Sequence, residues 1–190
     1  VKGNKLPAVA GEWVDFKMGS GTVVSDGDAN LLMSTISGMP KYRDQIMNID
    51  DTFICNGVNV GTGHVNYEGA VLVNGDVTEK MQIKAAGDVT INGFVESAHI
   101  EAGGDIIITE GAMGKVNDSQ GEFQCKLVAS GSIHVQHGQG IDIQCGGNIT
   151  VGRQLAYSRL RCGGAVIVGQ IDKPMGNLFA CDIISQDRVE

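Results

Sequence analysis

Aromatic residues are scarce in this sequence, which has one Trp, three Tyr and five Phe among 190 residues. We therefore expect a core of Val, Ile, Leu and Ala. Only three prolines are present and glycine follows no Gly-X-Y period, so collagen is excluded. No run approaches the roughly 20 apolar residues of a membrane-spanning helix, and no basic–apolar–small signal opens the chain. These absences predict a protein that is not inserted in a membrane.

Basic residues are also in deficit, because 14 Lys and Arg stand against 22 Asp and Glu, a formal charge of −8. That balance argues against nucleic acid or an anionic membrane surface as the main partner. The five cysteines are odd in number and widely spaced, which favours a reduced, cytosolic setting over a disulfide framework. The chain begins with Val rather than Met, so we expect it to be cut from a longer protein.

Glycine, in contrast, is abundant at 28 residues, and it marks a repeat. Residues 71–75 (VLVNG) read like 89–93 (VTING), and 83–87 read like 100–104. A period of 17 to 18 residues is the size of one coil of a β-solenoid. Because apolar and polar residues alternate in each short strand, one side points inward, and neighbouring coils must stack to bury it. The sequence therefore predicts an all-β fold, a single-stranded parallel β-helix.

The repeat assigns three inward columns of aliphatic residues. The first column is Val71, Val89, Ile106, Ile133, Ile149 and Val166; the second is Val73, Ile91, Ile108, Val135, Val151 and Val168; the third is Ile83, Ile100, Leu127, Ile143 and Leu160. The glycines that open the coils are spaced by 18, 17, 27, 16 and 17 residues, so one coil is about ten residues longer than the others. We place the surplus in an insertion at 111–121.

The first 50 residues do not follow the repeat. Residues 22–24 and 31–33 are apolar and flank a Ser-Asp-Gly-Asp turn, which predicts a β-hairpin. We therefore divide the chain into a small β-rich N-terminal module at 1–50 and a parallel β-helix domain at 51–190.

These motifs resemble a known family. Stretches 73–77, 86–93 and 95–106 are similar to the repeat region of flagellar assembly protein A, and 129–133 and 145–149 are similar to its later coils. The resemblance implies a right-handed β-helix in a cytoplasmic bacterial protein, with flagellar or polar regulatory proteins as partners. It leaves recruitment to the cell pole and a homo-oligomer open. The function implied is a non-catalytic scaffold for protein binding in flagellar assembly or its regulation.

Two other functions compete with this one. The same Gly-Asp-Ile/Val coils also resemble the C-terminal β-helix of the cell-division inhibitor MinC, although residues 1–50 do not suggest that protein's N-terminal domain. A polysaccharide-active β-helix enzyme is the third hypothesis. It is expected to carry aromatic platforms and long loops with clustered carboxylates, whereas this chain has one Trp and one modest insertion.

Residues that could carry chemistry have simpler structural interpretations. Asp88 and Asp105 follow the opening glycines of adjacent coils, where short carboxylates hydrogen-bond to turn backbone. Cys145 and Cys162 share a column otherwise occupied by alanine, so we interpret them as buried free thiols. The four histidines form no ligand set with metal-binding spacing. We therefore predict no catalytic residue, no cofactor and no metal.

A partner is expected to dock at the insertion, because loops inserted into a repeat often mark its binding face. A passive bulge is the alternative. The residues assigned to this contact are Met113, Lys115, Asn117, Asp118 and Phe123, together with three basic residues on later coils, Arg153, Arg159 and Arg161. A second surface is predicted from the residues that directly precede the third inward column. They form a solvent-facing column of alternating charge: His99, Lys126, Asp142 and Arg159.

Overall fold

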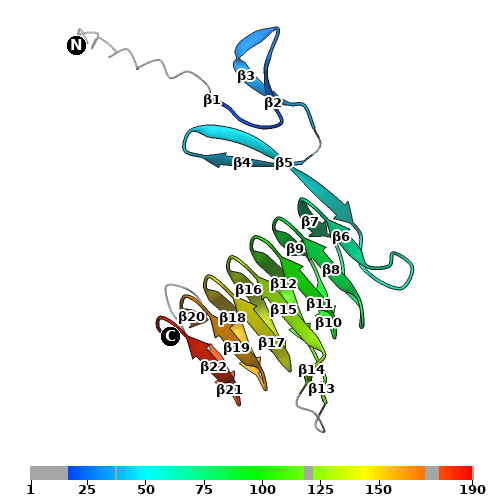
Figure 1. Ribbon diagram of the computed structural model, residues 1–190, viewed down its shortest axis with the longest axis vertical. Helices are drawn as coiled ribbons and strands as arrows, with labels where there is room; N and C mark the ends of the chain where they lie inside the picture. The colour runs from blue at the N-terminus through cyan, green and yellow to red at the C-terminus, as the bar shows by residue number, and fades with distance from the viewer. Residues whose placement is uncertain (1–16, 37, 118–121, 170–175, 190) are drawn as a thin grey trace, which may run out of the picture. The chain divides into compact units, whose positions relative to one another are not determined.

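The computed structural model describes residues 17–36, 38–117, 122–169 and 176–189, and every regular element in these ranges is a β-strand (Figure 1). The chain divides into two compact units, Val1–Asp50 and Asp51–Glu190. The all-β expectation is confirmed. The two units are described separately below.

The first unit contains short strands with largely exposed side chains. Its strands are β1 (Lys17–Met18), β2 (Thr22–Ser25), β3 (Asp28–Ser34), β4 (Gly38–Arg43) and the beginning of β5 (Ile46–Cys55). Strands β2 and β3 pair antiparallel with Val24 opposite Leu32, which confirms the predicted hairpin. Strand β4 pairs with β5 through a turn at Asp44 and Gln45, whose φ angles of 53° and 64° are typical of a type I′ hairpin.

The second unit is a stack of coils whose strands pair in parallel with the equivalent strands of the next coil (Figure 1). Each complete coil contributes segments to three rows. The first row holds residues 52–55 of β5, then β7 (Ala70–Val73), β9 (Val89–Ile91) and the first halves of β12 (Ile106–Met113), β16 (Ile133–Gln139) and β18 (Ile149–Ala156), and ends at β20 (Val166–Val168). The second row holds β10 (Phe94–Glu96), the last three residues of β12, β16 and β18, and β21 (Asn177–Phe179). The third row holds β6 (Val65–Tyr67), β8 (Gln82–Ala85), β11 (His99–Ala102), β15 (Cys125–Ala129), β17 (Ile141–Cys145), β19 (Arg159–Cys162) and β22 (Asp182–Ser185).

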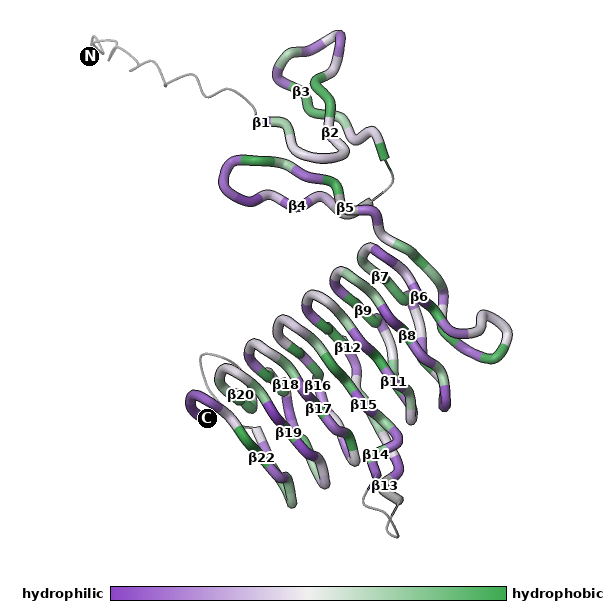
Figure 2. Tube along the Cα trace, in the orientation of Figure 1, coloured by the Kyte–Doolittle hydropathy of each residue, from purple (hydrophilic) through white to green (hydrophobic). Residues whose placement is uncertain are grey.

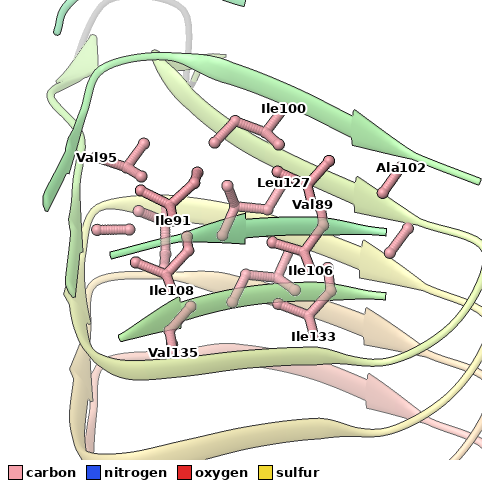
Figure 3. Close-up of a cluster of buried hydrophobic side chains, with 14 of the residues drawn as sticks. Val89, Ile91, Val95, Ile100, Ala102, Ile106, Ile108, Leu127, Ile133 and Val135 are labelled. Atoms are coloured by element: carbon pink, nitrogen blue, oxygen red, sulfur yellow. The ribbon is translucent and has the colours of Figure 1, made fainter. Parts of the chain in front are cut away.

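The three predicted aliphatic columns lie inside the stack, in the predicted register. Val89, Ile106 and Ile133 are consecutive Cα partners, as are Ile91, Ile108 and Val135. Every residue of the three columns is at most 3% exposed. Figure 3 shows these side chains directed toward Ile100 and Leu127 of the third row. In Figure 2 the chain alternates between hydrophobic and hydrophilic along the coils, as strands with one buried side require.

A fourth inward column in the second row was missed in the sequence. Its buried residues are Val58, Val77, Val95, Ala112, Gly138 and Leu155. A Cβ added to Gly138 would lie 2.7 Å from Ile141 Cδ1 and 2.8 Å from Leu155 Cδ1, so two large side chains fill the space that this glycine leaves. Because side chains from neighbouring positions fill the space at the small residues, the column is not aliphatic in every coil and the repeat does not reveal it.

A ladder of side-chain hydrogen bonds explains the glycine that opens each coil. Asp88 Oδ1 accepts a bond of 2.9 Å from the backbone N–H of Asp105, and Asp105 Oδ1 accepts one of 2.6 Å from the N–H of Ser132. Ser132 and Asn148 continue the pattern. A Cβ on Gly104 would collide with Asp88 Oδ1. The turn interpretation of Asp88 and Asp105 is therefore correct, and the glycine makes room for the carboxylate.

Candidate protein-interaction groove

The long coil leaves the regular path at Gly114 rather than at Gly111. Residues 111–113 complete β12 and pair with β10 on one side and β16 on the other. The inserted part is an antiparallel hairpin of β13 (Val116–Asn117) and β14 (Glu122–Phe123), at whose base Gln124 N donates to Lys115 O over 3.2 Å. The predicted start at 111 is therefore wrong, because Gly111 and Ala112 look like turn residues but are buried where the coil allows only small side chains.

A groove of about 620 Å³ lies beside this hairpin. Its lining comes from the hairpin and from three successive coils: Gly114, Lys115, Phe123, Gln139, Gly140, Tyr157, Ser158, Arg159, Ala180 and Asp182. Ser158 is buried, donates its hydroxyl to Ala156 O at 2.7 Å and accepts the N–H of Ile141 at 3.2 Å. This serine therefore joins two coils at the base of the groove and has both hydrogen bonds satisfied internally.

Arg159 links the hairpin to the coils. Its guanidinium carbon lies 5.0 Å from the centre of the Phe123 ring, within the range of a cation–π contact. Its Nε lies 3.8 Å from a carboxylate oxygen of Asp182 on the next coil. The side chain is about one-third exposed, so part of its charge faces the groove. Phe123 thus anchors the hairpin to the solenoid while lining the groove.

Asp142 corrects the prediction of a solvent-facing charged column. The register is as predicted, since Lys126 pairs with Asp142 and Asp142 with Arg159. Asp142 is only 7% exposed, however, and one oxygen lies 3.9 Å from Arg159 while Oδ1 is buried without a hydrogen-bond partner. The column is therefore not uniformly exposed. Arg159 lies beside Asp142 and also contacts Phe123 of the inserted hairpin, and position in the sequence repeat alone does not indicate these contacts.

Exposed apolar side chains extend the groove along the second row. Tyr157 is 51% exposed, and its ring meets the 60% exposed Phe179 edge-on at 5.3 Å. Met113 is 48% exposed and belongs to the same outward column as Phe179. Tyr157 has a φ of 51°, an uncommon conformation for a bulky side chain. It occupies the corner where the coil turns from the second row into the third.

The structure brings together only part of the predicted contact set. Lys115, Phe123 and Arg159 line one groove. Arg153 lies on β18 and Arg161 beside Cys145 and Ile184, both exposed but outside that groove. Asn117 belongs to β13, although its side chain is not described, and Asp118 lies outside the described residues.

Six further groove residues were not predicted: Gln139, Gly140, Tyr157, Ser158, Ala180 and Asp182. Tyr157 had a usable signal, because one of the few aromatic residues of the chain falls in a turn next to Arg159.

The other reactive groups have roles in packing. Cys145 and Cys162 pair in register as free thiols, but only Cys162 is buried as predicted, because Cys145 is half-buried. Their thiols donate to Gly147 O at 3.4 Å and Gly164 O at 3.2 Å. Burial, with a smaller effect of Cys162, raises the pKa of Cys145 to about 11, and burial raises that of Cys125 to about 11. His137 meets Phe94 edge-on at 5.2 Å. In the described parts of the chain, no three His, Cys, Asp or Glu residues are grouped so that they could hold a metal ion.

Parallel coils around aliphatic columns, with a lined groove at one hairpin, define a β-solenoid protein. The family model for the flagellar assembly protein A β-solenoid domain matches residues 51–190, and the model for that protein's N-terminal region matches residues 1–45. The chain belongs to the flagellar assembly protein A family. No curated protein and no solved structure matches it. No helix in the described ranges is long and apolar enough to span a membrane.

Proposed function

We propose that this chain is a non-catalytic scaffold of flagellar assembly that holds a protein partner in the groove beside the β13–β14 hairpin. The observation that carries the proposal is the groove lining, in which Phe123 and Tyr157 offer aromatic surface while Lys115 and Arg159 offer positive charge. Aromatic and arginine side chains are the residue types that most often dominate protein–protein binding energy. The rigid coils hold them in fixed positions, so little conformational entropy is lost on binding.

The partner segment that fits this lining presents a carboxylate beside an apolar side chain. Arg159 is shared between Phe123 and two carboxylates of its own chain, whereas no ion pair of Lys115 is found in the described residues. An incoming carboxylate therefore finds a cation at the hairpin and aromatic surface nearby. We place the complex in the cytoplasm, in keeping with the five thiols, and include recruitment to the cell pole in the proposal.

The chemistry of the buried groups supports a non-catalytic role. Cys125 and Cys145, with pKa values of about 11, stay protonated at neutral pH, and a protonated thiol is a poor nucleophile. Ser158 donates to a backbone carbonyl rather than to a base. Neither the serine that lines the groove nor these two thiols, which lie outside it, is thus activated as a nucleophile.

Removal of the hairpin tests the proposal most cleanly. Because Lys115 O and Gln124 N are already hydrogen-bonded, residues 116–123 can be replaced by Asn-Gly with that bond kept as the i to i+3 bond of a two-residue turn. The expected result is an unchanged thermal transition with loss of partner capture from lysate of the flagellated source cells, identified by mass spectrometry. Undiminished capture of every wild-type partner by the folded variant would falsify the groove assignment.

Point variants separate the groove from general charge effects. Tyr157→Asn suits the positive φ while removing the ring, and Lys115→Glu reverses the hairpin charge. Arg161→Glu is the matched control, since it changes the same charge on the third row outside the groove. We expect the first two variants to reduce partner capture by about tenfold or more and the control to keep it. Equal losses in Lys115→Glu and Arg161→Glu, with capture kept by the uncharged change Tyr157→Asn, would show a diffuse charge effect instead of a site.

A further inference from the structure

The outward side of the first row differs from the rest of the solenoid surface. Between the two inward columns, each strand points one residue outward, and these residues are Cα partners from coil to coil. The column is Ile54, Leu72, Thr90, Ile107, His134, Thr150 and Ile167. It contains no carboxylate, lysine or arginine. Ile54 is 59% exposed and Ile107 is 41% exposed, so apolar surface is open along it.

The neighbouring outward positions widen this uncharged strip. The residues that follow the second inward column are Asn56, Asn74, Asn92, Thr109 and Gln136. Asn92 Nδ2 donates to Asn74 Oδ1 over 3.2 Å, so the amides are ordered along the stack. Charged side chains lie at the edges of the strip, with Asp88 and Asp105 where the strands begin and Glu110 and Arg153 where they end.

The outward side of the third row has the opposite character. Lys84 Nζ lies 2.8 Å from Glu101 in one outward column, and Lys126, Asp142 and Arg159 are consecutive Cα partners in the other. The whole chain carries a formal charge of −8. Packing the third row against a second copy would take its ion pairs out of water, which is costly, whereas packing the strip of the first row buries no lysine, arginine or carboxylate of its outward column.

The strip is large enough for a specific contact. Seven strands about 4.8 Å apart span about 30 Å, and the strip together with the edge position where each strand begins, five residues at about 3.3 Å each, spans about 16 Å. The product, about 500 Å² on each copy, gives about 1,000 Å² in total, which is the size at which specific interfaces begin. Two sheet faces of this kind pack with their strands aligned to within about 30°.

We propose that the outward side of the first row is a homodimer interface, in which this strip packs against the same strip of a second copy of the chain. Ile107 is the middle residue of the column, so a two-fold axis that overlaps the two strips brings Ile107 against its own copy. The groove is lined from the hairpin and from the corner between the second and third rows. A dimer through the first row therefore leaves a groove open on each subunit, and its existence does not depend on the groove's function.

The test is the mass of the full 190-residue chain by sedimentation equilibrium at about 100 μM, a concentration that populates dimers of micromolar affinity. Ile107→Lys places two like charges at the axis. Val128→Lys is the matched control, because Val128 faces outward from the third row of the same coil. We expect wild type and Val128→Lys at twice the 19.9 kDa chain mass, and Ile107→Lys at the single-chain mass with an unchanged far-UV spectrum. A monomeric wild type, a dimeric Ile107→Lys or a monomeric Val128→Lys each overturns the proposal.

A cysteine pair provides a second test in case Ile107→Lys does not fold. Ile107→Cys keeps an uncharged side chain, and glutathione disulfide is the oxidant: each sulfur–sulfur bond formed between two copies reduces one glutathione disulfide to two thiols. We expect disulfide-linked dimer from Ile107→Cys and none above the wild-type background from Val128→Cys. If Ile107→Cys gives no more linked dimer than Val128→Cys, the two strips do not face each other and the proposal fails.

Discussion

Neighbouring residues on the same strands of the solenoid occupy opposite environments. Ile106 and Ile108 are fully buried, whereas Ile107 between them is 41% exposed. Inside, every position of the three predicted columns is aliphatic from the coil of Val71 to the coil of Val166. Outside, the column that contains the apolar Ile107 also contains the polar residues His134 and Thr150. The inside repeats because each coil must bury its apolar side on the next. The outside is free of that constraint, so partner binding can be built there without altering the fold.

The largest effect is expected from a charge placed inside. Ile108→Asp buries an unpaired carboxylate between Ile91 and Val135, which cannot be solvated or paired, so we expect no folded solenoid. Ile108→Val is the control and should cost about 1 kcal/mol. Far-UV circular dichroism and urea unfolding measure both. A cooperative transition for Ile108→Asp at the wild-type midpoint would show that this column is not the core.

The next largest effect is expected at the turn that opens a coil, where a glycine makes room for a carboxylate. Gly104→Ala places a Cβ where Asp88 Oδ1 lies, so the bond to Asp105 N must break, at a cost of about 2–3 kcal/mol. Gly27→Ala is the control, since nothing lies within 4 Å of its added Cβ. Urea unfolding of the double variant Asp88→Ala/Gly104→Ala should recover part of the loss, because the clashing oxygen is gone. A double variant that is destabilised by the full sum would contradict the steric account.

A smaller effect is expected at Asp142, which lies between the two environments. Its carboxylate is buried, and one of its oxygens has no hydrogen-bond partner. The other oxygen makes a long ion pair to Arg159, which would still be paired with Asp182 if Asp142 were removed. Its desolvation therefore offsets its attraction, and Asp142→Ala should change the free energy of unfolding by less than about 1 kcal/mol. Thermal and urea unfolding decide this, and a loss of several kcal/mol would mean that the pair contributes strongly to stability.

The smallest effect is expected on the exposed side of the third row. Hydrogen bonds from Lys84 and His99, both at 2.8 Å, lower the pKa of Glu101. A lowered folded-state pKa gives stability that is present above the unfolded value and is lost as pH falls through the folded value. Glu101→Gln should therefore cost about a few tenths of a kcal/mol at pH 7 and nothing in strong acid. Urea unfolding of both proteins at both pH values checks this, and a pH-independent difference would point to a cause other than charge.

The contrast between a repeating interior and a variable exterior also explains which parts of the fold could be predicted from the sequence. The columns through Ile106, Ile108 and Leu127 could be assigned from sequence because each coil repeats the same inward requirement. The column through Ala112 and Gly138 could not, since the space at Gly138 is filled by Ile141 of the third row and by Leu155 of the next coil.

The groove was only partly predictable. The surplus length of one coil pointed to the hairpin, and Lys115, Phe123 and Arg159 were assigned to the contact. Tyr157 and Asp182 come from later coils, and only the stacking places them beside the hairpin. The burial of Asp142 depends on side chains from outside its own strand, which a repeat pattern does not encode. Residues whose environment repeats are thus predictable, and residues whose environment occurs in one coil are not.

The most direct measurement of the central claim is a substitution scan of residues 51–189 in the flagellated source cell, read out twice for each variant, as protein level and as swimming. The account predicts two separate groups. Polar substitutions in the inward columns lower protein level and swimming together, whereas substitutions at Lys115, Phe123 and Tyr157 reduce swimming at normal protein level. If the groove variants swim normally, or if every loss of swimming follows a loss of protein, the division between a folding interior and a binding exterior is contradicted.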